Sequence, residues 1–92
     1  MVTIYSQMQN TSSNSGCYVS FAVDGGTPSD ATALMLQGTT GIVSPGTRMS
    51  GTFLVTGLSA GNHTFTMKYK SVSTTGGATC SYDDRTITVL PY

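Results

Sequence analysis

The chain has 92 residues, and its four basic and four acidic side chains give a formal net charge of zero. A chain this short forms one domain, since it buries only about 60–65% of the surface that its unfolded form exposes and cannot divide that core in two. A protein that grips nucleic acid through the phosphates needs a surplus of Lys and Arg. The charge balance therefore argues against nucleic acid as a partner.

Hydroxyl side chains dominate the composition, with 16 Thr and 12 Ser against eight charged residues. Thr is β-branched and suits a pleated, partly exposed surface, so this composition favours strands over helices. The sequence contains no apolar run near the ~20 residues that cross a bilayer, and its first ten residues lack the basic and apolar blocks of a signal peptide. We therefore expect no membrane insertion, and either synthesis in the cytoplasm or release from a longer protein.

Six extended segments follow one another along the chain, separated by turn clusters rich in Gly, Pro and Asp. The strands are predicted at 2–8, 17–24, 31–37, 48–57, 63–71 and 79–90, with a possible split of the last one near Asp83 and Asp84. Turn signals at such short intervals are typical of all-β sandwiches and barrels. We predict a single all-β domain over residues 1–92, an antiparallel two-sheet β-sandwich of about seven to eight short strands.

A period of two in the side chains assigns inner and outer faces to three of these segments. In each segment, apolar residues alternate with smaller or more polar ones. The apolar sets predict the clearest parts of the core, which are Val19, Phe21 and Val23, then Phe65, Met67 and Tyr69, and finally Ile87 and Val89.

The alternation fails where three large apolar residues are consecutive, at 34–36 and at 53–55. An extended strand directs successive side chains to opposite faces, so Met35 and Leu54 are left for the outer face unless a bulge intervenes. The apolar tail of the chain adds to this set of candidate exposed residues.

Two interpretations of these apolar residues stay open. In the first, loops such as 38–47 cover these residues, or the residues are exposed singly without any function, as is common for apolar residues on a surface. Alternatively they form a contact between subunits, in which burial would contribute about 1.5–3 kcal/mol for each large side chain. The candidate interface residues are Met35, Leu54, Leu90 and Tyr92.

Cys17 and Cys80 are the only two cysteines, and each opens a predicted strand. In a two-sheet fold such positions can face each other closely enough for a disulfide, which would stabilise the chain by about 4 kcal/mol in the chain-entropy model. A cytosolic protein, however, keeps its thiols reduced. Both interpretations stay open, and we favour two small buried thiols over the disulfide.

Few side chains are available for chemistry. The sequence has no Glu or Trp, and its only His, His63, lies in a Gly-Asn-His-Thr turn where a solvated residue is the ordinary expectation. Asp83 and Asp84 are adjacent, so an extended chain directs them to opposite faces and makes them a poor acid/base pair. Asp24 and Asp30 join them as potential Ca²⁺ ligands, but no Asp-x-Asp-x-Asp spacing is present. We expect no catalytic residue, no metal site and no cofactor.

Two surface features remain. Lys68 and Lys70 project from one face of the same predicted strand, where a solvated face is the ordinary role. Aromatic rings present apolar faces to carbohydrate, so the five tyrosines offer a possible stacking platform for sugar rings. The alternative function is therefore a carbohydrate-binding module that uses some of Tyr5, Tyr18, Tyr69, Tyr82 and Tyr92.

One combination of turn and strand phrases is similar to a known family. It comprises Phe53 to Thr56, the run Gly57-Leu58-Ser59-Ala60-Gly61-Asn62-His63-Thr64-Phe65-Thr66 and the ending Arg85-Thr86-Ile87-Thr88-Val89, with Tyr18 to Gly26 upstream. These residues resemble the C-terminal β-sandwich domain found at the ends of phage tail-fibre and other minor virion structural proteins. The resemblance covers most of the chain.

This resemblance implies a jelly-roll-like sandwich that is commonly trimeric, is carried on the outside of a bacteriophage particle and is not an enzyme. We therefore expect a virion surface protein, either a capsid decoration or a tail-fibre tip used in adhesion. It would be synthesised in the host cytoplasm and would contact other virion proteins. The chain starts with Met close to the first strand and has no preceding shaft, which fits a free-standing head decoration or an excised tip. A module that contacts a host glycan is the alternative.

Overall fold

The computed structural model describes residues 1–10, 15–37, 44–73 and 80–91, which contain six β-strands and one 3-10 helical turn. The elements are β1 (Val2–Asn10), β2 (Ser15–Val23), η1 (Asp30–Thr32), β3 (Leu34–Gln37), β4 (Ser44–Phe53), β5 (Phe65–Ser73) and β6 (Cys80–Val89). The all-β class is confirmed. The described strand number is slightly below the predicted seven to eight, because β6 runs through Asp83 and Asp84 without a break.

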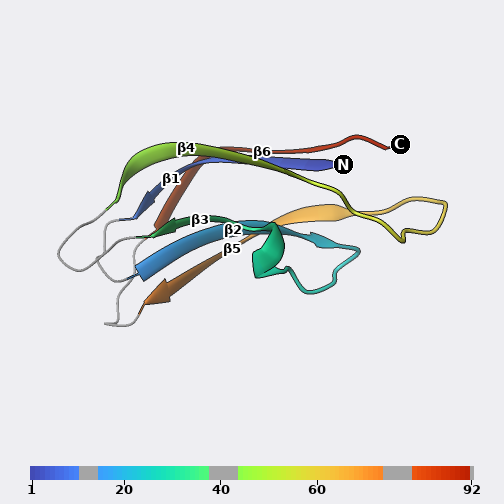
Figure 1. The fold of residues 1–92 in the computed structure, drawn as a ribbon, viewed down its shortest axis with the longest axis horizontal. Coiled ribbons are helices and arrows are strands. Elements are labelled where there is room, and N and C mark those ends of the chain that lie inside the picture. The colour runs from blue at the N-terminus through green and yellow to red at the C-terminus, as the bar shows by residue number, and fades with distance from the viewer. Residues whose placement is uncertain (11–14, 38–43, 74–79, 92) are drawn as a thin grey trace.

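The strands form two three-stranded antiparallel sheets that stack as the layers of a sandwich (Figure 1). Sheet A has the order β4-β1-β6 and sheet B has the order β3-β2-β5, so β1 and β2 are the central strands. The Cα radius of gyration is 14.3 Å, against about 12 Å for a compact domain of this length. The molecule is therefore an elongated two-layer sandwich, with principal extents of 48 × 21 × 16 Å.

Two strand boundaries differ from the prediction. The segment expected to extend from residue 31 first forms η1, whose N-cap Ser29 accepts a hydrogen bond from the backbone N–H of Ala31, and β3 begins only at Leu34. The strand expected to end at 57 ends at Phe53, and Gly57 has a φ of 78°, a left-handed conformation that lies outside the φ range of regular strands. Residues 54–64 therefore form an irregular connection between β4 and β5.

The deepest part of the core lies on β1, which the sequence pattern did not single out. Val2, Ile4 and Met8 are fully buried, because β1 has a strand on each side and sheet B across its inner face. Ser6 and Asn10 occupy the remaining inward positions of the same strand. The inward positions of β1 are therefore not all apolar, and the sequence pattern does not indicate that this face is buried. The inward residues of β2 are also buried, as predicted for Val19 and Phe21, together with Cys17.

A β-bulge in β6 reverses which of its side chains face the core. Tyr5 pairs with Thr86 but Gln7 pairs with Asp83, so two residues of β6 oppose one residue of β1. Asp84, at the bulge, has a left-handed φ of 49°. Even-numbered residues such as Tyr82 pack on the core before the bulge, whereas Ile87 packs on it afterwards. The bulge is what turns Ile87 inward, whereas Val89, also predicted for the core, is 40% exposed at the end of the strand.

Cys17 and Cys80 form a disulfide, which corrects the expectation of two separate thiols. Cys17 lies on β2 in sheet B and Cys80 opens β6 in sheet A, so the bond joins the two layers. Their Cα atoms are 5.7 Å apart, within the usual range for a disulfide. The expectation rested on the compartment of synthesis, whereas the pairing follows from strand geometry, which brings both residues to the inner faces at one end of the sandwich.

A hydrogen bond next to the disulfide also crosses between the sheets. The hydroxyl oxygen of Tyr82 on β6 lies 3.0 Å from the carbonyl oxygen of Tyr18 and 3.1 Å from that of Lys70, both in sheet B. Its single proton is donated to one carbonyl at a time. The Tyr82 ring packs against the ring of Tyr69 at a centroid distance of 4.8 Å, and burial raises the pKa of Tyr82.

Removal of the disulfide should lower the free energy of unfolding strongly. The bond joins residues 63 positions apart, and closing a loop of that length contributes about 4 kcal/mol by constraining the unfolded chain. We expect this loss in the double variant Cys17→Ala/Cys80→Ala, measured by urea unfolding, with reduced wild-type protein as the matched control. An unchanged unfolding midpoint in both samples would contradict a stabilising cross-sheet bond.

Tyr82→Phe should cost more stability than the same change at an exposed tyrosine. It removes a partly buried cross-sheet hydrogen bond, for which the loss is about 0.5–1.5 kcal/mol. Tyr5→Phe is the control, because the Tyr5 hydroxyl accepts an exposed bond from Arg48 at 2.8 Å and its loss should stay within about 0.5 kcal/mol. Equal losses in urea unfolding would show that Tyr82 does not brace the sheets.

Candidate functional site

Large apolar side chains form a row across one end of sheet A. Val2 pairs with the last residues of both β4 and β6, so the next cross-strand row consists of Leu54, Met1 and Leu90. The backbones of Met1 and Leu90 exchange two hydrogen bonds, of 2.8 and 2.9 Å. The three residues are 66%, 45% and 55% exposed, respectively. This row is therefore contiguous, unlike single apolar residues scattered over a surface.

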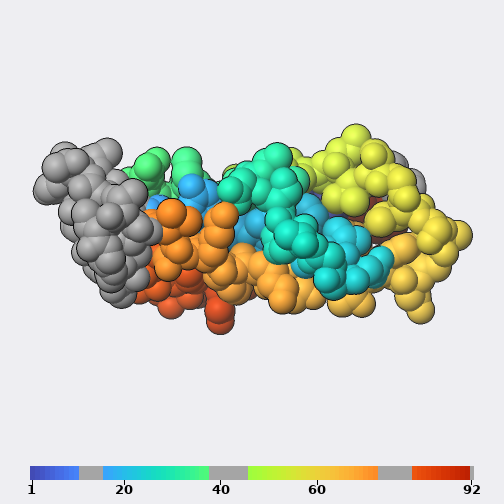
Figure 2. Space-filling model, turned by 90° about the horizontal axis from the view of Figure 1, so that it is seen from below, coloured from blue at the N-terminus to red at the C-terminus, as the bar shows by residue number. Residues whose placement is uncertain are grey.

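An apolar groove lies behind this row, at the same end of the sandwich. Its volume is about 280 Å³, and a second hollow of about 690 Å³ adjoins it along the 54–64 segment. Figure 2 shows this segment in yellow at the right-hand end of the molecule, with a hollow beside it. The groove is lined mainly by Met1, Val2, Val55, Leu58, Phe65, Val89 and Leu90.

We call the row and the groove together the apolar end. None of the described residues that line its two hollows is Asp, Glu, Lys or Arg. The terminal ammonium group of Met1 donates to the carbonyl oxygen of Leu90, and the one titratable side chain in the described lining, His63, is bonded to Asp24. The apolar end can therefore bury apolar surface against a partner without desolvating an unpaired charged side chain.

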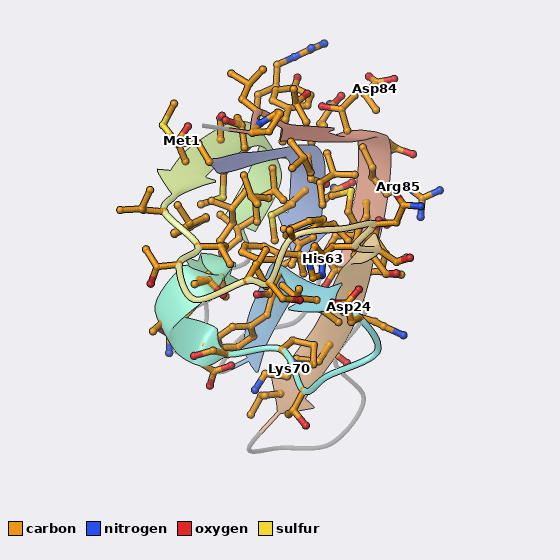
Figure 3. All side chains as sticks on the ribbon, turned by 90° about the vertical axis from the view of Figure 1, so that its right-hand side faces the viewer. Met1, Asp24, His63, Lys70, Asp84 and Arg85 are labelled. Carbon is orange, nitrogen blue, oxygen red and sulfur yellow. A yellow bond between two sulfur atoms is a disulfide. The ribbon has the colours of Figure 1, made fainter. Side chains whose placement is uncertain are left out.

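His63 is held on both sides, in contrast to the solvated turn residue that the sequence predicted. Its Nδ1 lies 2.6 Å from Oδ2 of Asp24, and its Nε2 lies 2.6 Å from the carbonyl oxygen of Ser59. The other carboxylate oxygen of Asp24 accepts a bond of 2.8 Å from the backbone N–H of Thr64. Figure 3 faces this end of the molecule and shows His63 next to Asp24.

The electrostatics of this pair favour its charged form. The Asp24 carboxylate, and after it the Ser59 carbonyl, raise the pKa of His63 above its usual 6.5. The hydrogen bond from His63, followed by that from the Thr64 backbone, lowers the pKa of Asp24 below its usual 3.8. The sequence held no signal for this pair, because its partners lie 39 positions apart.

The four predicted interface residues do not share one surface. Leu54 and Leu90 lie together at the apolar end. Met35 is also exposed, but it lies on β3 opposite Tyr18, in sheet B. Tyr92 lies outside the described residues. The prediction therefore identified part of the apolar end, and it missed Met1 and Leu58, which only the strand register and the path of residues 54–64 bring there.

The tyrosines of the predicted sugar platform do not all lie together, because Tyr5 is on sheet A while Tyr18, Tyr69 and Tyr82 lie near one another. Tyr5 bonds to Arg48 on sheet A, Tyr82 reaches across to sheet B with Tyr69 against its ring, and Tyr18 lies under the ammonium group of Lys70. Tyr92 lies outside the described residues. Tyr18 and Tyr69 both line a shallow pocket of about 130 Å³, but Lys70 beside it is paired with Asp30 at 2.9 Å. The described tyrosines therefore do not form one stacking surface.

Groups for catalysis or metal binding are not assembled in the described part of the chain. No three His, Cys, Asp or Glu side chains lie together there in a way that could hold a metal ion. Both ring nitrogens of His63 are engaged, so it does not present a free base. The described residues also contain no helix that is long and apolar enough to span a membrane.

We compared the chain with protein-family models, with curated proteins and with solved structures, and found no match. The resemblance to phage fibre domains therefore stays an expectation. The functional interpretation rests on the fold, the apolar end and the Asp24–His63 pair.

Proposed function

We propose that the protein is a non-enzymatic structural component of a bacteriophage virion surface and that it self-associates through its apolar end. The observation that carries this proposal is the contiguous surface formed by the row of Met1, Leu54 and Leu90 with the groove behind it, whose described lining contains no Asp, Glu, Lys or Arg. Exposed apolar patches of this kind mark interaction surfaces. A zero net charge adds no long-range repulsion between copies of the chain.

The cross-sheet disulfide supports a location outside a reducing compartment. Disulfides persist on virion and cell surfaces and in secreted proteins, and they are rare in the cytosol. A virion protein made in the cytoplasm of its host meets oxidising conditions after release. Under those conditions the disulfide between Cys17 and Cys80 stays oxidised and holds the two sheets of this small domain together.

The proposed mode of action is mechanical and adhesive. Hydrogen-bonded strands and a covalent link between the layers give a firm, elongated module, and exposed segments such as 24–33 are available for other virion proteins or the host surface. The trimer is the assembly that the resemblance implies. Closed rotational symmetry would place the apolar ends of the copies around a common axis.

Self-association should be lost when the exposed row becomes polar. Burial of Leu54 and Leu90 contributes about 1.5–3 kcal/mol each, so Leu54→Ser/Leu90→Ser should weaken association by about a hundredfold to ten-thousandfold. Sedimentation velocity over a concentration series would measure this, with wild-type protein expected to sediment as a trimer. Both side chains are largely exposed in the single chain, so the variant should remain folded.

Met35→Ser is the matched control, because Met35 is exposed to a similar degree but lies on β3 away from the apolar end. It should associate like the wild type. A wild-type protein that stays monomeric at the highest attainable concentration would remove the self-association, and loss of association in Met35→Ser alone would move the interface to sheet B.

The assignment to a virion is tested separately by the genes that flank the coding sequence. Adjacent capsid genes would favour a head decoration, whereas adjacent tail genes would favour a fibre tip. A neighbourhood without any virion genes would contradict the assignment and leave self-association to be judged by itself.

A further inference from the structure

The turn after β2 and the 54–64 segment meet at the edge of the apolar end. Asp24 and Thr64 lie just beyond the last pair of the β2–β5 ladder, and the backbone N–H of Asp24 donates to the carbonyl oxygen of Thr64 at 2.7 Å. Asp24 has a left-handed φ of 51°, which directs the chain into the turn at Gly25. The His63 ring then joins this turn to Ser59, within the segment that lines both hollows.

Both contacts of the His63 ring require a proton on the nitrogen. The carboxylate of Asp24 and the carbonyl of Ser59 are acceptors only, so each ring nitrogen has to donate. A neutral imidazole carries one N–H. Once the ring is neutral, one of the two 2.6 Å contacts would set a nitrogen lone pair against an oxygen lone pair, and the attraction between the ring and the carboxylate is lost as well.

We propose that Asp24, His63 and Ser59 form a pH-operated latch, which holds the 54–64 segment against the turn after β2 while His63 is doubly protonated and releases it when the ring becomes neutral. The 54–64 segment supplies Val55 and Leu58 to the lining of the groove. Release of the latch therefore widens access to the apolar end. This device stands on the ring geometry and does not depend on the proposed virion function.

Few charged groups face the His63 ring from the elements packed around it. The turn after β2 contributes Asp24, and the 54–64 segment contributes the Ser59 carbonyl. Of the segments on the far side of the groove, the end of β6 and the residues after it contribute only the uncharged Val89, Leu90 and Pro91. The start of β1 brings the Met1 ammonium group, which is bonded to the carbonyl oxygen of Leu90.

The direction of the pH dependence follows from the two pKa shifts. Because the pKa of His63 is higher in the folded chain than its usual 6.5, the latch contributes its full stability below that pH and loses it as the pH rises through the folded pKa. The pKa of Asp24 is lowered, so its contribution is present above its usual 3.8 and is lost as the pH falls through its folded pKa. The latch is closed between these limits.

The test is an NMR titration of the wild-type chain from about pH 5.5 to about pH 9, the range in which a histidine changes charge. It follows the His63 ring signals together with hydrogen-exchange protection, corrected for intrinsic exchange rates, of the Asp24 and Thr64 amides, whose hydrogen bonds join the segment to the turn. We expect the ring to titrate above pH 6.5, and protection to fall with the same midpoint. A ring that titrates at or below 6.5, or protection that does not follow the ring, would overturn the latch.

Two charge-matched variants separate the latch from a general charge effect. Asp24→Asn retains an acceptor for the Thr64 amide, and Asn tolerates the left-handed φ of this position. This variant should lower the pH midpoint of the ring titration and that of the loss of amide protection. Asp30→Asn removes the same charge and breaks the pair with Lys70, far from the ring in the sequence and on another surface. It should leave the midpoint in place, and an equal shift in both variants would refute the latch.

Discussion

The bond between Cys17 and Cys80 fixes the two sheets to each other in the half of the sandwich where the inner face of β1 becomes polar. Ser6 and Asn10 are buried there on either side of Met8, so only one of the three inward positions in this half of β1 is apolar, whereas Val2 and Ile4 make both inward positions nearer its start apolar. The tyrosine bond from β6 to sheet B reinforces the same half. A chain of 92 residues has a small core, and a covalent link is a common way to compensate for that.

With the layers fixed, the position of every candidate group follows from the strand ladders. The β1 register sets Leu54 and Leu90 on either side of Met1, and the β2–β5 ladder ends where Asp24 meets Thr64. The apolar surface and the histidine pair thus occupy the same end of the molecule because three separate strands finish there. The irregular 54–64 segment is the element that connects the two features.

The sequence period predicted the strands and most of their faces, because alternation is a local property that burial enforces residue by residue. Leu54 was correctly left outside by this reasoning, and Val19 was correctly placed inside. The central position of β1 was hidden, since Ser6 occupies an inward site without an apolar signal. The disulfide and the contacts of His63 depend on which distant segments pair, and no local pattern encodes that pairing.

The irregularity at Asp84 has a consequence for the electrostatics of the last strand. Asp83, Asp84 and Arg85 are consecutive and all three are exposed, although an ordinary strand with one face against a core must aim every second side chain at the interior. The additional residue that the bulge inserts in β6 lets two successive side chains avoid the interior. All three charged residues therefore stay in contact with water at the centre of a partly buried strand. Shortening the segment by one residue would regularise the ladder and direct an ionic side chain towards Ser6, into the dry layer between the sheets.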